Sequence, residues 1–224
     1  EIMKNIVCFI LFFLTGISMA QKIELGGCVT MPIVVAHRGS SFTAPENTIA
    51  SVMLAWRQGA PMAECDIRLS KDKRVMVMHD PNTARTGRIF LKIADTNSAE
   101  LRNLDVGSWK DPKYKNEKIP FLEELVQTIP QGRVLIIEIK CGPEIIPYLK
   151  KIVDDSGKRK QLAIISFNLD AVAESKTTMP DVPAYYLMGT ETDKKTNKPK
   201  EHSLDLLKIA KEKGLDGLDL HYGG

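Results

Sequence analysis

From residue 33 onward, short runs rich in valine and isoleucine alternate with segments whose apolar residues repeat at the helical period. The runs are continuously apolar, which is typical of strands covered on both sides in a parallel sheet. Seven such runs, without the glycine fingerprint of a nucleotide-binding sheet, predict an α/β fold of the TIM (β/α)8-type barrel class. We expect the strands at residues 33–37, 62–69, 75–79, 134–140, 162–167, 184–188 and 217–222.

A barrel of this class typically needs about 250 residues and has one strand more than the seven runs provide. The chain has 224 residues and stops at Gly224, soon after the seventh run. We therefore expect the eighth strand to be missing at the C-terminus of a single barrel domain at residues 21–224. The formal net charge of +3, from 31 basic and 28 acidic residues, is too balanced to indicate a nucleic-acid-binding protein.

The first twenty residues have the pattern of a secretory signal peptide. Lys4 gives a positive start, residues 6–14 are almost continuously apolar, and small residues precede a cleavage site after Ala20. The apolar run is shorter than the roughly 20 residues that span a bilayer, so we expect no stable membrane span. The predicted location is periplasmic or secreted. Lipoprotein anchoring at Cys28 is disfavoured, because charged residues separate it from the apolar run.

Two helices and one insertion are marked along the chain. We expect Pro45 in the first turn of a helix that ends at Gly59, and Ser203 as the cap of a helix that ends before Gly214. Residues 81–120 are too long for a simple connection and predict an insertion at the end of the barrel where sites lie. The apolar stripes of these helices are Ile49, Val52, Met53 and Trp56, and Leu206, Leu207 and Ala210.

Acidic residues stand near the carboxyl ends of two predicted strands. Glu64 and Asp66 are two positions apart, so both project to one face, while Cys65 points to the other face and packs there. Glu138 stands near the end of the fourth predicted strand. Three carboxylates meeting at a barrel mouth would repel one another unless a cation joined them. An all-oxygen ligand set favours one hard divalent cation, Ca²⁺ or Mg²⁺, over zinc.

Basic residues and histidines occupy equivalent strand ends. His37 ends the first predicted strand and His79 the third, and a pair of imidazoles can supply one general base and one general acid. Arg38 and Lys140 offer positive charge that suits a phosphate group. A metal site, two cations and two histidines together indicate phosphoryl chemistry.

These motifs resemble those of the glycerophosphodiester phosphodiesterase family, in order, from about residue 33 to residue 222. The resemblance implies metal-dependent hydrolysis of glycerophosphodiesters, which are deacylated phospholipids, to glycerol 3-phosphate and an alcohol. It implies either direct attack by water or an internal attack that first gives a cyclic phosphate. The matching segments are His37-Arg38-Gly39, Pro45–Thr48, Glu64-Cys65-Asp66, His79-Asp80-Pro81, Leu104–Trp109, Ile119–Glu124 and Glu138-Ile139-Lys140.

The resemblance also assigns roles to individual residues. The substrate would be a small-molecule glycerophosphodiester, and a single divalent cation would be the cofactor. The implied roles are metal binding by Glu64, Asp66 and Glu138, acid and base catalysis by His37 and His79, and substrate binding by Arg38, Lys140 and Glu46.

Two other functions stay open from the sequence alone. The missing eighth strand fits a non-catalytic, truncated fragment that binds metal or ligand without turnover. A related barrel phosphodiesterase that cleaves intact phospholipids is the other alternative. Asp219 and His221 share a face of the last predicted strand and could line the site, but no motif supports this, so we expect a structural role for both.

Overall fold

The computed structural model describes residues 33–190, 192, 196–197 and 199–220. The predicted signal peptide at residues 1–20, the cysteine at position 28 and His221 lie outside the described residues. The predictions of export and of a missing eighth strand therefore stay predictions. Within the described part of the chain, no helix is both long and apolar enough to cross a membrane.

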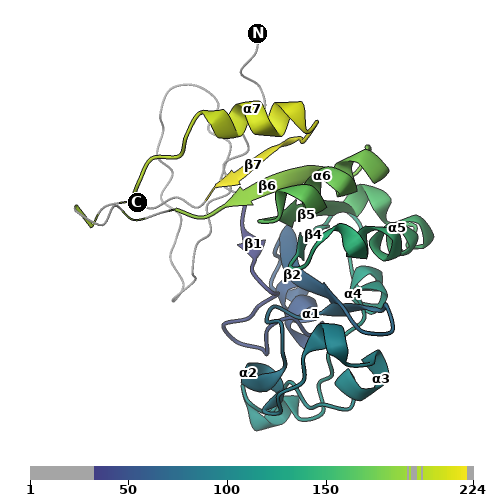
Figure 1. Cartoon of the computed structure of the whole chain (residues 1–224). Coiled ribbons are helices and arrows are strands. Elements are labelled where there is room, and N and C mark those ends of the chain that lie inside the picture. Colours follow the sequence, from purple (N-terminus) through teal and green to yellow (C-terminus); the bar gives the residue numbers. More distant parts are fainter. Residues whose placement is uncertain (1–32, 191, 193–195, 198, 221–224) are drawn as a thin grey trace.

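The described strands form one sheet in which six are parallel, in the order β1-β2-β4-β5-β6-β7 (Figure 1). This uninterrupted order is that of a barrel wall, whereas a doubly wound sheet reverses its order at a switch point. The α/β barrel class is thus confirmed, and within the described residues no pairing joins β1 to β7. The strands are β1 (Val35–Ala36), β2 (Met62–Leu69), β3 (Val75–Val77), β4 (Val134–Ile139), β5 (Leu162–Ser166), β6 (Ala184–Met188) and β7 (Gly217–Leu220).

Strand β3 differs from the prediction of a third parallel strand. It pairs antiparallel with β2, with Leu69 opposite Val75, and it lies off the main path of the sheet. Only residues 70–74 join the two strands. A parallel crossover needs a dozen or more residues, so this connection can only form a hairpin. The backbone N–H of Ser70 donates to the carbonyl oxygen of Arg74, the backbone N–H of Arg74 donates to Oγ of Ser70, and Lys73 in the turn has a positive φ of 64°.

Helices cover the outer face of the sheet, and α5, α6 and α7 follow one another towards the top of Figure 1. The helices are α1 (Ile49–Arg57), α2 (Ala84–Gly87), α3 (Ser98–Leu101), α4 (Leu122–Gln127), α5 (Ile146–Asp155), α6 (Leu169–Thr178) and α7 (Asp205–Glu212). Four short 3₁₀ turns complete the fold at η1 (Ile93–Asp95), η2 (Pro112–Tyr114), η3 (Pro143–Ile145) and η4 (Arg159–Gln161).

The predicted start of α1 was wrong and its end was right. Thr48, not Pro45, precedes the first helical residue. The Thr48 side chain accepts a hydrogen bond from the backbone N–H of Ser51, and the backbone N–H of Thr48 donates to Oγ of Ser51, so the two residues cap the helix together. The helix ends before Gly59, which has a φ of 84°. The predicted apolar stripe of α1 packs against the main core.

The stripe predicted for α7 is only partly buried. Ala210 is buried, but Leu207 is 56% exposed. The predicted cap was wrong, because Leu204, whose side chain accepts no hydrogen bond, directly precedes the first helical residue. Ser203 lies one residue earlier, and its hydroxyl accepts from the backbone N–H of Asp205. Gly214 follows the helix with a φ of 68°.

Two apolar layers lie on the two faces of the sheet. The large layer includes Cys65 and Ile137 from the sheet together with Val52, Leu125 and Leu149 from α1, α4 and α5. The smaller layer lies on the other face and contains Ile136, Ala163 and Ile165, with Met62, Tyr185 and Leu187 packed against it. Because the strands are buried on both faces, they read as continuous apolar runs.

The predicted insertion at residues 81–120 contains α2, η1, α3 and η2. It has a small core of its own, in which Ile93, Leu101, Leu104 and Ile119 pack against Met76 of β3. Figure 1 shows α2 and α3 together at the bottom of the molecule, at the end opposite α7. The hairpin β2–β3 therefore anchors the insertion next to the carboxyl end of β2.

Candidate active site

Three carboxylates from β2 and β4 meet on the inner face of the sheet. Asp66 pairs in register with Glu138, and Glu64 pairs with Ile136 of the inner apolar layer. Cys65 is fully buried in the outer layer, which confirms the predicted alternation along β2. Glu64, Asp66 and Glu138, hereafter the carboxylate triad, are all buried, and their oxygens come within 4.8 Å of one another.

Two carboxylate oxygens of the triad lack a hydrogen-bond donor. Oε1 of Glu64 and Oδ1 of Asp66 are buried and accept no hydrogen bond from the described residues. Burial, followed by the charge of Asp66, raises the pKa of Glu64 well above its ordinary value. Burial also raises the pKa of Glu138, although a hydrogen bond from Lys140 opposes this shift.

Such oxygens fit a divalent cation, which would supply the missing partner and remove the repulsion. Lys140 is the nearest internal cation. Its Nζ lies 2.7 Å from Oε1 of Glu138 and 3.6 Å from Oδ1 of Asp66. Lys140 and Arg38, which also contacts Asp66 but is shared with Glu46, do not balance three carboxylates, so the arrangement still favours an added cation.

The end of β1 brings His37 and Arg38 to the triad. Nε2 of His37 lies 3.9 Å from Oε2 of Glu64, and the backbone N–H of Arg38 donates to the same oxygen at 2.8 Å. Burial and the charge of Arg38 lower the pKa of His37 below its ordinary value. Arg38 has a φ of 56° and is followed by Gly39 with a φ of 77°. A Cβ at Gly39 would come within 2.7 Å of backbone atoms of α1, so the tight turn requires glycine there.

The Arg38 guanidinium bridges the triad to a second group of acids. Its Nε lies 3.3 Å from Oδ2 of Asp66, and its Nη1 donates to Oε1 of Glu46 at 2.9 Å. Glu46 is therefore the partner of the predicted phosphate-binding arginine. Its pKa is lowered: burial alone would raise it, but hydrogen bonds from Arg85 and the charge of Arg38 outweigh burial.

Arg85 of α2 holds two carboxylates at once. Its Nη1 and Nη2 donate to the two oxygens of Glu46, each at 2.7 Å, and its Nε donates to Oδ2 of Asp80 at 2.7 Å. Oδ1 of Asp80 lies 2.7 Å from Nδ1 of His79. Burial alone would raise the pKa of Asp80, but the hydrogen bonds from Arg85 and His79 lower it to about 2. We call Glu46 and Asp80 the arginine-held pair.

The ionised Asp80 has a consequence for His79. A carboxylate only accepts hydrogen bonds, so we assign the ring proton to Nδ1. Nε2 of His79 is then the ring nitrogen left for substrate. All eight predicted site residues thus lie in one connected network of ion pairs and hydrogen bonds.

Three further residues support this network, and none of them was predicted to belong to the site. Asn47 donates to Oδ2 of Asp66 at 2.7 Å and accepts from the backbone N–H of Asp66 at 3.1 Å. Arg68 donates to the carbonyl oxygens of His79 and Lys140, each at 2.8 Å, and so fixes two strand ends to each other. The third residue is Arg85. Asn47 lies in the matching segment Pro45–Thr48, and Arg68 follows Asp66 by two positions and so shares its face of the strand. Both could therefore have been predicted as site residues from the sequence.

The family model for the glycerophosphoryl diester phosphodiesterase family matches residues 37–220, which include the whole site. The chain belongs to this family. The predicted resemblance is therefore confirmed for most of the described chain, and five of its seven matching segments supply residues of the network above.

Two curated relatives and one solved structure illustrate the match to the phosphodiesterase family. The glycerophosphodiester phosphodiesterase of Bacillus subtilis is 29% identical over 198 residues, covering 79% of this chain and 66% of that protein. The one from Caldanaerobacter subterraneus is 36% identical over 155 residues, covering 66% of this chain and 63% of that protein. The chain thus spans slightly less than two thirds of both relatives. An Oleispira antarctica phosphodiesterase in complex with the product sn-glycerol-3-phosphate is 29% identical with a TM-score of 0.68, covering 86% of this chain and 94% of that one.

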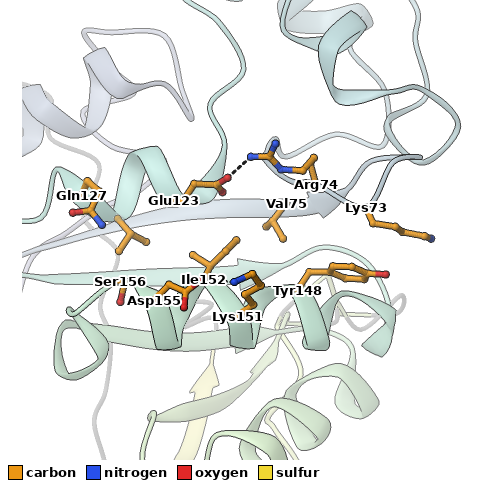
Figure 2. A pocket seen from close by; sticks show the side chains of 11 residues that line it. Lys73, Arg74, Val75, Glu123, Gln127, Tyr148, Lys151, Ile152, Asp155 and Ser156 are labelled. Atoms are coloured by element: carbon orange, nitrogen blue, oxygen red, sulfur yellow. Dashed lines mark hydrogen bonds and ion pairs between the residues drawn. The ribbon is translucent and has the colours of Figure 1, made fainter.

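A surface cavity of about 420 Å³ lies elsewhere, between the β2–β3 turn, α4 and α5 (Figure 2). None of the eight predicted site residues lines it. Four of its five charged side chains are paired with one another: Arg74 with Glu123, as Figure 2 shows, and Lys151 with Asp155. We therefore place the candidate active site at the triad, where chemically reactive groups converge, and not at this cavity.

Proposed function

We propose that the protein is a metal-dependent phosphodiesterase that hydrolyses glycerophosphodiesters to glycerol 3-phosphate and an alcohol. One observation carries the proposal: a buried triad, in which two oxygens accept no hydrogen bond, lies in one network with two cations and two histidines. Family membership supports the same reaction. The name of the Oleispira antarctica structure, which includes the product glycerol 3-phosphate, supports a small-molecule substrate.

In this proposal Glu64, Asp66 and Glu138 hold one divalent cation, Ca²⁺ or Mg²⁺. When bound, the cation polarises the phosphoryl group and stabilises the charge that develops on its oxygens. Arg38 and Lys140 contribute the fixed positive charge of the chain to the same oxygens. Their own carboxylate contacts keep both side chains in place before substrate binds.

The two histidines would move the protons. The lowered pKa of His37 keeps its ring neutral near pH 7, so it takes the proton of the nucleophile. His79 acts in its imidazolium form, in which Nδ1–H donates to Asp80 and the proton on Nε2 passes to the oxygen of the departing alcohol. The nucleophile is either water or the glycerol hydroxyl of the substrate, and the second route forms a cyclic phosphate that water then opens.

The direct test is release of glycerol 3-phosphate from glycerophosphocholine and glycerophosphoethanolamine by the 224-residue chain. We expect turnover that a chelator abolishes and that Ca²⁺ or Mg²⁺ restores. Absence of turnover with added metal would favour the alternative of a non-catalytic fragment. Turnover of intact phospholipids in preference to both diesters would favour the other alternative.

A further inference from the structure

The strand registers define a layer of side chains next to the triad. Glu138 pairs with Ile165 of β5, and Ile165 pairs with Tyr185 of β6. Leu187, two residues farther along β6, pairs with Asp219 of β7. Alternate residues share a face of a strand, so the next layer towards the carboxyl ends lies on the face that carries the triad. Across four neighbouring strands this layer contains Lys140, Phe167, Leu187 and Asp219.

Phe167 presents an open aromatic ring beside the phosphate-binding lysine. Its ring centre lies 5.6 Å from Nζ of Lys140, and 53% of the residue is exposed. A Cβ built on Gly189, just after β6, would lie 4.0 Å from Cε1 of the same ring. The ring therefore extends from the phosphate-binding side of the site towards the ends of β6 and β7.

Asp219 is a buried carboxyl group that the described chain does not use. It is 8% exposed, and among the described residues no hydrogen bond or ion pair reaches it. Burial raises its pKa to about 6, so it is mostly ionised at pH 7 and above. Its oxygens are not among the fully buried polar atoms without a hydrogen bond, so the carboxylate is open to a cationic group of a ligand. The structural role expected for Asp219 from the sequence does not explain a carboxyl group at this position.

We propose that Phe167 and Asp219 form the subsite for the alcohol part of the substrate, and that this subsite favours a cationic amino alcohol of the choline or ethanolamine class. The proposal rests on the proposed function. An ammonium group is attracted to an aromatic face within about 6 Å of the ring centre, and the carboxylate supplies the opposite charge. Leu187, between the two, offers apolar contact to methyl groups. A neutral alcohol such as glycerol gains neither attraction.

The test compares two diesters that release the same glycerol 3-phosphate. We expect the 224-residue chain, with Ca²⁺, to have a kcat/KM about tenfold higher for glycerophosphocholine than for glycerophosphoglycerol. Asp219→Asn and Phe167→Leu should each lower kcat/KM for glycerophosphocholine much more than for glycerophosphoglycerol, so that most of this preference is lost. Phe167→Tyr keeps an aromatic face and should keep the preference.

Two matched controls remove the same chemical groups elsewhere. Glu174→Gln neutralises an exposed carboxylate on α6, and Phe90→Leu removes an aromatic ring that is 62% exposed in the insertion. Both should leave the ratio of the two kcat/KM values unchanged. Binding of choline phosphate, measured by calorimetry with Ca²⁺ present, provides a readout that needs no turnover and should weaken about tenfold in Asp219→Asn.

The outcomes separate the two proposals. Hydrolysis of both diesters with equal efficiency, or equal losses on both in the Asp219 and Phe167 variants, overturns the subsite and leaves the phosphodiesterase function intact. No hydrolysis of any diester, with choline phosphate binding that depends on Asp219, overturns the function and supports the subsite. Binding of choline phosphate that is unchanged in Asp219→Asn overturns the subsite in either case.

Discussion

Two groups of carboxylates at the same end of the sheet differ in their hydrogen bonding and in the direction of their pKa shifts. The triad is buried, retains two oxygens without hydrogen bonds, and has raised pKa values at Glu64 and Glu138. Both members of the arginine-held pair are hydrogen bonded to Arg85 and have lowered pKa values. The chain neutralises the pair with its own charge, whereas the triad needs a cation from outside. The difference separates the residues that we propose to bind metal from those that we propose to position the histidine and the arginine.

The largest expected effect comes from breaking the triad. Glu64→Gln can keep an oxygen on the backbone N–H of Arg38, while its amide nitrogen replaces the unpartnered Oε1. We expect kcat/KM for glycerophosphocholine to fall at least about 10³-fold, because a ligand and its charge are lost from the metal site. The thermal midpoint of the metal-free chain should not fall, since one repulsive charge is removed. Activity above a tenth of the original would show that Glu64 is not a ligand.

Removing the proton donor should have the next largest effect. His79→Ala deletes the ring but leaves the backbone carbonyl that accepts from Arg68. We expect kcat to fall about 10²–10³-fold with a much smaller change in KM, as for loss of a general acid. A substrate with a good leaving group, such as a nitrophenyl ester, should be affected far less. Equal losses on both substrates would contradict the assignment.

The positions of these residues were largely predictable, because polar residues at the ends of apolar strands stand out in sequence. Glu64 and Glu138 are examples, since burial at those places needs a reason. The direction of β3 was misjudged from its apolar pattern, although the five-residue connection from Leu69 to Val75 already excluded a parallel strand. The length of the connection between β2 and β3 is therefore a better indicator of strand direction than their apolar pattern.

The arginine-held pair shows where sequence reasoning stops. Arg85 lies 39 residues from Glu46, on a four-residue helix with no apolar stripe, so nothing local links the two. Their contact depends on how the insertion packs against β3 through its own small core. Such a contact is a property of tertiary packing and is not encoded in periodicity. The start of α1 is a milder case, since Thr48 is as good a cap as Pro45 is a first-turn residue.

Metal binding should stabilise the triad but not the pair. The raised pKa values of Glu64 and Glu138 favour their neutral forms in the folded chain. The metal-free chain therefore has its full stability from these groups at low pH and loses it as pH rises through their folded pKa values. Ca²⁺ at about 100 times its Kd should add about 2.7 kcal/mol of stability at pH 8 and much less at pH 5. Differential scanning fluorimetry with Ca²⁺ or with chelator, at both pH values, checks this.

Glu64→Gln provides the matched control for the metal effect. It should lose most of the Ca²⁺-dependent rise in thermal midpoint, whereas Glu123→Gln, outside the triad, should keep it. An equal shift at both pH values would contradict a site built from carboxylates with raised pKa values.

The smallest effect is expected from breaking the arginine-held pair, because its residues act through others. Arg85→Gln removes the donors shared by Glu46 and Asp80, so His79 and Arg38 lose the support of fixed neighbours. We expect about a tenfold loss in kcat/KM, as for supporting residues around a metal site, with unchanged Ca²⁺ stabilisation. Arg85→Lys should recover little, because one ammonium group cannot bind both carboxylates in the same geometry. Asp80 would then titrate nearer to its ordinary pKa. A loss of Ca²⁺ stabilisation equal to that of Glu64→Gln would mean that the two carboxylate groups form one site.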